Sequence, residues 1–295
     1  MIATTGFFDG VHLGHSLVIE RLVSEAHSRG DESLVVTFWP HPRAVLQDGA
    51  RELRLLNTLD EKKELLRSLG VDRVEVLDFT RSFAALTAEQ YLREVLLGRF
   101  GVTTLLMGYD NRLGSDRLTA ASLKPLAGGM GVELMELSPL SFRPGEARGE
   151  ISSTQIRTAL ERGDIASAAE MLGYAYSLKG AVVAGNRLGR TIGFPTANMK
   201  LYEPLKLIPG RGVYAVDVEV LGRKFRGMTN IGTRPTVGGI TTSIETHILD
   251  FDEDIYGLPL RVTFLRRLRD EVRFPSLEEL KAQLEKDQEA CRQHF

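Results

Sequence analysis

The chain has 295 residues, of which 43% are hydrophobic and 26% are charged, and its formal net charge is −2. This composition is typical of a globular protein of about two domains, and the charge favours neither nucleic acid nor a membrane surface as partner. No apolar run approaches the ~20 residues of a membrane-spanning helix, and the chain enters a strand at once, so we expect no membrane anchor or secretion signal. The lone cysteine, Cys291, has no internal disulfide partner, which favours a cytoplasmic location.

The first half alternates predicted strands and helices. Apolar strands are expected at residues 2–5, 34–38, 71–76, 102–107 and 132–137. Capping boxes starting at Thr58 and Thr87 open two of the helices between them. This alternation predicts an α/β domain whose parallel sheet is covered by helices on both faces, with ligands beyond the carboxyl ends of the strands. We expect the domain to span residues 1–172, because Asp164 caps its last helix and Gly173 ends that helix.

The pattern changes after about residue 175. Strands are expected at residues 178–184, 213–220, 224–229, 244–251 and 260–265. Glycine, proline and asparagine cluster between them, and no helical crossover is apparent. This half, residues 173–295, is therefore predicted to be an antiparallel β-barrel or sandwich with a C-terminal helix that begins at Ser276.

Two histidines mark the end of the first strand. His12 and His15 belong to the run TGFFDGVHLGH and are expected to open a helix, where backbone N–H groups and the helix dipole favour an anion. The pair could instead only share a helix face, or ligate a metal, although no third ligand stands at a familiar zinc spacing. The spacing resembles the HxGH signature of nucleotidylyltransferases. The candidate nucleotide contacts of this run are Gly6, Phe8, Asp9, Gly10 and Gly14.

The run ISSTQIR supplies a second candidate phosphate site. Its three hydroxyl residues, Ser152, Ser153 and Thr154, stand at a predicted helix start, and Arg157 follows one turn later. One hydroxyl would be enough for an ordinary cap. Three hydroxyls and an arginine are typical of an anion cradle for the phosphates of a nucleotide.

Two further segments follow strands of the first half. Asp110 and Asn111 lie in the run MGYDNRLG, which is a glycine-bracketed polar loop of the kind that contacts small molecules. His41 lies in FWPHP, which is either a pocket wall or merely a rigid exit from a strand. All these segments are expected to meet at one edge of the sheet.

A glycine- and arginine-rich segment, GNRLGRTIGFPTAN, stands near the start of the second half. It lacks the Gly-Lys pair of a Walker loop, and it could simply be a surface loop. Against this, Thr196 and Asn198 place a hydroxyl and an amide close together, and such oxygen ligands suit the Mg²⁺ carried by a nucleotide. The candidate phosphate contacts of the segment are Gly185, Arg187, Gly189, Arg190 and Gly193.

Two more segments complete the predicted site of the second half. A turn-rich polar segment runs from Asn230 through Arg234 to Thr236, and Glu245 and His247 share one face of a later strand. A charged strand residue usually faces solvent. If this face lines the barrel pocket, Glu245 could take a proton from an alcohol, as a phosphoryl-transfer site requires.

Together these segments resemble the bacterial bifunctional riboflavin kinase/FMN adenylyltransferase family over almost the whole chain. The resemblance is carried by GFFDGVHLGH, TFWPHP, GYDNRLG, ISSTQIR, GRTIGFPTANM, NIGTRPTV, ETHILDFDEDIYG and RDEVRFPSLEELKAQLEKD. It implies a Rossmann-like nucleotidyltransferase domain of HxGH type followed by a riboflavin kinase barrel. It also implies two reactions: riboflavin and ATP give FMN and ADP, and FMN and ATP give FAD and pyrophosphate. The implied ligands are Mg²⁺, ATP and flavins, and the expected partners are these small molecules, with no nucleic acid and no membrane.

The resemblance also implies residue roles. The catalytic candidates are His12, His15, Arg157 and Glu245. The flavin contacts are Asp110, Asn111, Asn230 and Arg234, and the metal ligands are Thr196 and Asn198. Phe7 stands where the family commonly has Asn, and Asn111 stands where it often has an aromatic residue. Two alternatives therefore remain: a riboflavin kinase with weakened adenylyl transfer, and a flavin-binding or regulatory protein without catalysis.

Overall fold

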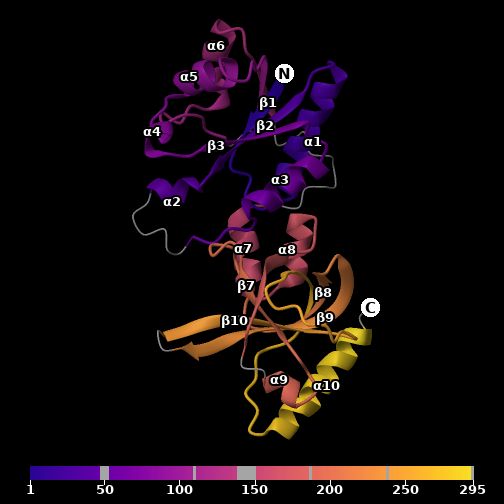
Figure 1. The fold of residues 1–295 in the computed structure, drawn as a ribbon. Coiled ribbons are helices and arrows are strands. Elements are labelled where there is room, and N and C mark those ends of the chain that lie inside the picture. The colour runs from indigo at the N-terminus through magenta and orange to yellow at the C-terminus, as the bar shows by residue number, and fades with distance from the viewer. Residues whose placement is uncertain (47–52, 109–110, 138–150, 186–187, 237–238, 294–295) are drawn as a thin grey trace. The chain divides into compact units, whose positions relative to one another are not determined.

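The structure is a computed structural model that describes residues 1–46, 53–108, 111–137, 151–185, 188–236 and 239–293 (Figure 1). The chain divides into two compact units, Met1–Ser153 and Thr154–Phe295. No helix in the described ranges is long and apolar enough to cross a membrane.

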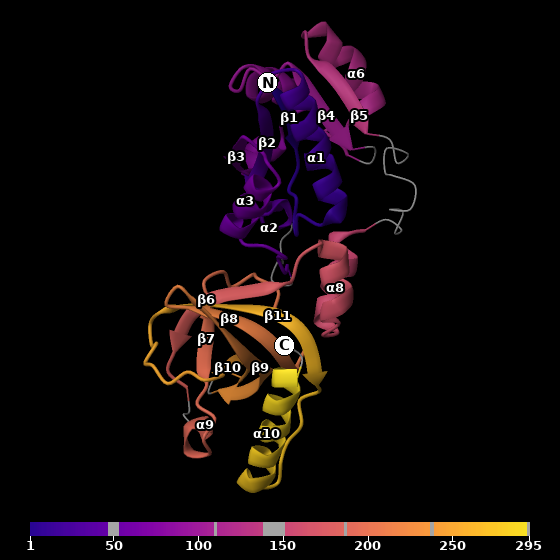
Figure 2. The ribbon, with the colours of Figure 1, turned by 90° about the vertical axis from the view of Figure 1, so that its right-hand side faces the viewer.

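A five-stranded parallel sheet forms the centre of the first unit, in the order β3-β2-β1-β4-β5 (Figures 1 and 2). Its strands are β1 (Ile2–Thr5), β2 (Ser33–Trp39), β3 (Arg73–Asp78), β4 (Thr104–Gly108) and β5 (Glu133–Leu137). The predicted α/β fold is confirmed. β2 pairs with one edge of β1 and β4 pairs with the other, so the order of the strands reverses at β1. The carboxyl end of β1 therefore lies at the topological switch point, where open α/β sheets bind ligands.

Helices cover both faces of this sheet. Successive residues of a strand point to opposite faces, so the apolar strands of this sheet present apolar side chains on both faces for helices to cover. The helices are α1 (Leu13–Ser28), α2 (Pro42–Leu46), α3 (Leu59–Ser68), α4 (Arg81–Ala84), α5 (Ala88–Gln90), the π-helix η2 (Tyr91–Leu97) and α6 (Ala120–Gly129). One core contains Ile2 of β1 with Leu22 of α1 and Leu66 of α3. The other contains Ala3 of β1 with Leu92 of η2 and Leu123 of α6.

The first turn of α3 is a capping box, as the sequence predicts. The Thr58 hydroxyl accepts a hydrogen bond from the Glu61 amide, and the Glu61 carboxylate accepts one from the Thr58 amide. The box fixes where α3 begins, and α3 starts just after a segment that contacts the loop between β1 and α1.

A closed antiparallel barrel forms the centre of the second unit, in the order β10-β7-β6-β11-β8-β9. Its strands are β6 (Ser177–Val183), β7 (Ala197–Leu201), β8 (Gly212–Val220), β9 (Arg223–Thr236), β10 (Gly239–Ile248) and β11 (Pro259–Arg269). Its helices are α7 (Ser153–Glu161), which begins at the unit boundary, α8 (Ile165–Leu172), α9 (Leu188–Thr191) and α10 (Leu277–Gln293). The predicted barrel and C-terminal helix are confirmed.

The structure corrects the sequence prediction in two places. The polar segment from Asn230 to Thr236 was predicted to be turn-rich, but it continues β9 and pairs with β10, with Thr236 opposite Gly239. The end of the glycine-rich segment was given no strand, yet β7 begins at Ala197 and pairs with both β6 and β10. In both places the backbone hydrogen bonds of a closed barrel outweigh local turn propensity.

Candidate active sites

The loop between β1 and α1 brings two histidine rings face to face. His12 is the N-cap residue of α1, and His15 lies in its first turn. The ring centroids are 3.7 Å apart, with 19° between the ring planes. Gly14 permits this stacking, because a Cβ atom at that position would lie 3.2 Å from the His12 ring. The predicted helix start at the histidines is confirmed.

The backbone of this loop is held in an unusual conformation. Phe8 and Val11 have φ angles of 52° and 36°, in the left-handed region that bulky and β-branched residues rarely adopt. The Asp9 carboxylate accepts hydrogen bonds from the amides of Leu56 and Asn57, at 3.0 and 3.4 Å, and so anchors the loop to the segment before α3. Strain of this kind persists where surrounding contacts impose it, and it is commonly found at functional sites.

Both histidines are neutral at pH 7. Burial lowers the pKa of His12 to about 4, and a carbonyl of its own backbone offsets only part of this effect. Burial lowers the pKa of His15 well below its usual value, and the charges of His12 and Lys62 lower it further. Nδ1 of His15 is buried and makes no hydrogen bond within the described part of the chain. The pair can therefore donate or accept hydrogen bonds, but it carries no charge of its own.

Some of the other predicted residues of the first half lie near this corner. Ser153 does, because its hydroxyl donates a 2.9 Å hydrogen bond to the Asp9 carbonyl. Asn111 stands three residues after the end of β4, and its amide donates a 3.1 Å hydrogen bond to the Gly108 carbonyl at the carboxyl end of that strand. Thr154 and Arg157 belong to the second unit and not to the unit that contains this corner. Asp110 lies outside the described residues.

The sequence analysis overlooked Lys62 of α3. This side chain is fully buried, and its ammonium lies 3.4 Å from the centroid of the Phe7 ring. Phe7 in turn contacts the His41 ring edge-on, with centroids 4.1 Å apart. The sequence gives little signal for this, because Lys62 stands in the charged run DEKKE, which is typical of a solvated helix face.

In the second unit, three adjacent strands bring polar residues side by side. Glu245 of β10 lies directly opposite Asn198 of β7 on one side and Asn230 of β9 on the other. Directly opposed residues point to the same face of a sheet, so a carboxylate lies between two amides. The Thr196 hydroxyl donates a 3.4 Å hydrogen bond to the Glu245 carboxylate. These oxygen donors fit a hard cation such as Mg²⁺.

Two glycines allow the chain to close around this cluster. A Cβ atom on Gly185 would overlap the side-chain amide of Asn198, and one on Gly189 would overlap the Phe194 carbonyl. Gly189 also accepts a 2.8 Å hydrogen bond from the Phe194 amide, which turns the backbone back toward β7. Gly193 adopts a positive φ of 84° in the same turn. Arg187 and the Arg234 side chain lie outside the described part.

His247 fixes the segment that carries Thr196. Its Nδ1 donates a 2.8 Å hydrogen bond to the Pro195 carbonyl, and its ring packs against Phe194 with centroids 5.2 Å apart. Burial lowers the pKa of His247, although the Pro195 carbonyl opposes the shift. His247 therefore positions the residues before β7.

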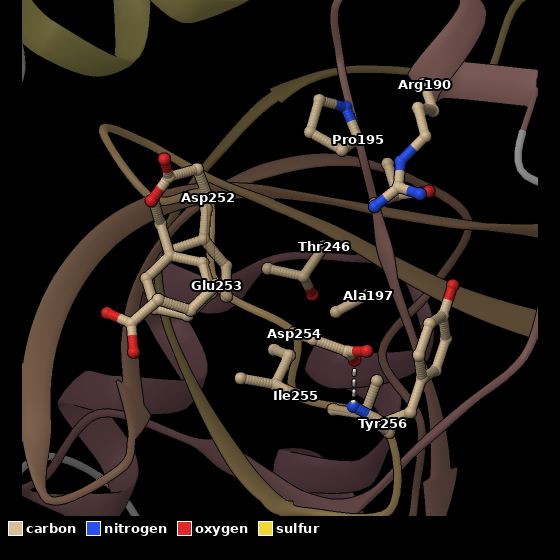
Figure 3. Close-up of a pocket in the computed structure, with 13 residues that line it drawn as sticks. Arg190, Pro195, Ala197, Thr246, Asp252, Glu253, Asp254, Ile255 and Tyr256 are labelled. Atoms are coloured by element: carbon tan, nitrogen blue, oxygen red, sulfur yellow. Dashed lines mark hydrogen bonds between the residues drawn. The ribbon is translucent and has the colours of Figure 1, made fainter.

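A cavity of about 260 Å³ opens beside Thr196 (Figure 3). Arg190 and Pro195 lie on one side of it, and Asp252 and Glu253 lie on another. The Asp254 carboxylate accepts a 3.1 Å hydrogen bond from the Tyr256 amide. The full lining is Val182, Arg190, Pro195, Thr196, Ala197, Thr246, Ile248 and residues 251–256. The sequence analysis assigned no role to residues 251–256, although this acidic run directly after the Glu245 strand was a usable signal.

Comparison with known proteins identifies the family of this chain. The riboflavin kinase family model matches residues 172–295, and the FAD synthetase family model matches residues 1–155. A bifunctional riboflavin kinase/FMN adenylyltransferase from Escherichia coli K12 is 41% identical over all of this chain and 92% of its own length. The chain belongs to the bifunctional riboflavin kinase/FMN adenylyltransferase family. The resemblance predicted from the motifs is confirmed.

A second member of this family and one solved structure are also similar to this chain. The family member from Bacillus subtilis 168 is 35% identical over all of this chain and 92% of its own length. A crystal structure described as a macrolide-efflux protein from Streptococcus pneumoniae is 34% identical, with a TM-score of 0.90 over 99% of this chain and 93% of that one. The similarity to this solved structure supports the fold of each of the two units.

Proposed function

We propose that the two reactions of this bifunctional enzyme take place at separate sites, one in each half of the chain. The chain is a riboflavin kinase and an FMN adenylyltransferase, and it forms FAD in two ATP-dependent steps. We assign FMN formation to the barrel and FAD formation to the corner beside β1. The proposed domains are residues 1–172 and 173–295, and the riboflavin kinase match begins at residue 172, next to that boundary.

In the barrel, Glu245 acts as the general base. Its carboxylate takes the proton of the primary alcohol of riboflavin as that oxygen attacks the γ-phosphorus of ATP, and ADP leaves. Thr196 and Asn198 would hold Mg²⁺, which would offset the charge of the nucleotide phosphates. The cavity beside Thr196 receives the nucleotide: its apolar walls suit a purine base, and Arg190 suits a phosphate. Asn230, which lies opposite Glu245, is proposed to contact the flavin substrate.

In the first half, a phosphate oxygen of FMN attacks the α-phosphorus of ATP in line, and pyrophosphate leaves. His12 and His15 are neutral, so they stabilise the transition state by hydrogen bonds, together with the amides at the start of α1. Ser152, Ser153, Thr154 and Arg157 are proposed to hold the outer phosphates. The step needs no covalent intermediate on the enzyme.

The observation that carries the proposal is the placement of Glu245 between Asn198 and Asn230, with the Thr196 hydroxyl bonded to its carboxylate. Incubation with riboflavin, ATP and Mg²⁺ tests it. FAD fluoresces less than FMN because adenine stacks on the flavin, so chromatography with fluorescence detection separates the two steps. We expect FMN to appear first and FAD to follow.

Two other outcomes would contradict this proposal. Accumulation of FMN without FAD would favour a kinase with weakened adenylyl transfer, which the contact of Phe7 with Lys62 makes worth testing. Unchanged riboflavin would favour a flavin-binding protein. The absence of nucleic acid and membrane partners and the cytoplasmic location stay predictions.

A further inference from the structure

Lys62 is buried next to the histidine corner. Its side chain has no exposed surface, and its ammonium lies 3.5 Å from the Thr37 hydroxyl and 3.4 Å from the centroid of the Phe7 ring. Burial lowers the pKa of Lys62 to about 8, and the charge of Asp9 opposes the shift. An ammonium group has three protons to donate, and a buried charge is costly unless it is compensated. A long hydrogen bond and one aromatic face compensate it only in part.

The contacts of α3 tie this lysine to the loop of the histidines. Asp9 holds the amides of Leu56 and Asn57, and α3 begins only two residues later. Lys62 lies one turn into α3, and its charge is close enough to His15 to lower the pKa of that histidine. Lys62 therefore brings a positive charge to a corner whose two histidines are neutral.

The position of Thr37 shows where this charge could act. Thr37 lies near the carboxyl end of β2, which pairs directly with β1, and its hydroxyl donates a 3.2 Å hydrogen bond to the Phe7 carbonyl. A group held between Thr37 and Phe7 is therefore at the edge of the sheet where ligands bind. Among the described residues, the charged or titratable groups that interact electrostatically with Lys62 are Asp9 of the loop and His15 of α1.

We propose that Lys62 is a phosphate-binding residue of the adenylyl-transfer site, whose ammonium exchanges the face of Phe7 for a phosphate oxygen of a bound substrate. This inference rests on the function proposed above for the histidine corner. The ligand chemistry is a phosphate group, which either the triphosphate of ATP or the phosphate of FMN supplies. A charge-assisted hydrogen bond to phosphate offsets the cost of burying the ammonium, which the aromatic face alone does not. The alternative is that Lys62 only packs against Phe7.

Kinetics of FAD formation from FMN test the proposal in the full-length protein. Because the reaction starts from FMN, riboflavin phosphorylation does not contribute. Lys62→Met keeps most of the side-chain length but removes the charge, and we expect it to raise the KM for ATP or for FMN by about tenfold or more. The substrate whose KM rises identifies which phosphate Lys62 binds. Lys62→Arg keeps the charge and should recover part of the loss, while FMN formation from riboflavin stays unchanged in both variants.

The pH dependence of kcat/KM for FAD formation distinguishes phosphate binding from packing, because a residue that only packs would not change this dependence. In the wild type, kcat/KM for FAD formation should fall above pH 8 as Lys62 loses its proton. In Lys62→Met this alkaline limb should be absent, and comparison at equal pH cancels the ionisation of the substrates. Wild-type KM values for both substrates, or an unchanged pH profile, would overturn the proposal.

A second variant covers the case in which Lys62→Met does not fold. Phe7→Leu keeps the lysine but removes the aromatic face that stabilises its charged form. The alkaline limb should then move to lower pH, and an unmoved limb would overturn the proposal. His15→Ala tests the proposed location of the adenylyl-transfer site separately from the role of Lys62. If it leaves FAD formation intact, the assigned site is wrong. If it abolishes FAD formation while Lys62→Met keeps wild-type KM values for both substrates, only the role of Lys62 fails.

Discussion

Burial keeps the stacked imidazoles of His12 and His15 uncharged, so the contribution that we propose for them in adenylyl transfer is hydrogen bonding. His15→Ala removes one such donor at the transition state, and we expect FAD formation from FMN to fall by roughly a hundredfold or more. FMN formation from riboflavin should be unchanged, because Glu245 and its neighbours lie in the other unit. Separate assays with FMN and with riboflavin measure the two rates. Equal losses in both would show that the assigned sites are not separate.

The buried histidines also make stability depend on pH. The folded-state pKa of His12, about 4, lies below the unfolded value of 6.5, so the unfolded chain binds more protons between these pH values. The free energy of unfolding should therefore fall as pH falls from 6.5 to 4, by about 3 kcal/mol for this residue at 1.4 kcal/mol per pKa unit. His12→Gln should weaken this dependence.

Urea unfolding followed by tryptophan fluorescence measures this effect in the first unit alone. Trp39 is the single tryptophan of the chain, and it lies at the end of β2. The wild type and His12→Gln are compared at several pH values in the acid range. If both lose the same stability between pH 6.5 and 4, His12 is not the buried neutral group that the structure describes.

At the scale of elements, the proposed kinase site depends on the close approach of Gly185 to strand β7. Gly185 leaves room for the side-chain amide of Asn198, which a Cβ atom would overlap. Gly185→Ala should therefore displace a proposed Mg²⁺ ligand and lower FMN formation about tenfold or more, as loss of a charge-bearing contact does. The rate of FMN formation at different Mg²⁺ concentrations measures the effect.

Gly128→Ala is the matched control, because a Cβ atom at this helical position meets nothing within 4 Å. This variant should leave both activities unchanged. In Gly185→Ala, FAD formation from FMN should also be unchanged. Wild-type FMN formation by Gly185→Ala would mean that Asn198 is not required where the structure places it.

The elements with strong local signals were predictable. Apolar strands and capping boxes such as that of Thr58 depend on nearby residues, and the structure confirms them. The strand from Asn230 to Thr236 was not predictable, because its Gly, Pro and Asn residues favour turns while its pairing partner lies on β10. Lys62 was missed for a similar reason: its local sequence is charged, and only the packing of α3 against the β1–α1 loop buries it.

At the scale of the whole molecule, the proposed separation of the two reactions between two compact units is the central feature. Each unit has its own sheet, and the proposed residues of FMN formation belong to the barrel alone. The motifs predict two halves that meet near residue 172, whereas the two compact units meet at Ser153 and Thr154, within the run ISSTQIR. Which side chains lie opposite Glu245 could not be predicted, since strand register within the barrel decides it.

Complementation between two variants that each lose one of the two activities tests this division most directly. His15→Ala should convert riboflavin only to FMN, and Glu245→Gln should convert FMN to FAD but leave riboflavin unchanged. When the two folded variants are mixed with riboflavin, ATP and Mg²⁺, we expect FAD to form, because FMN released by one is the substrate of the other. A mixture that forms no FAD from riboflavin, although each variant is folded and His15→Ala forms FMN, would contradict the assignment of the two reactions to two independent sites.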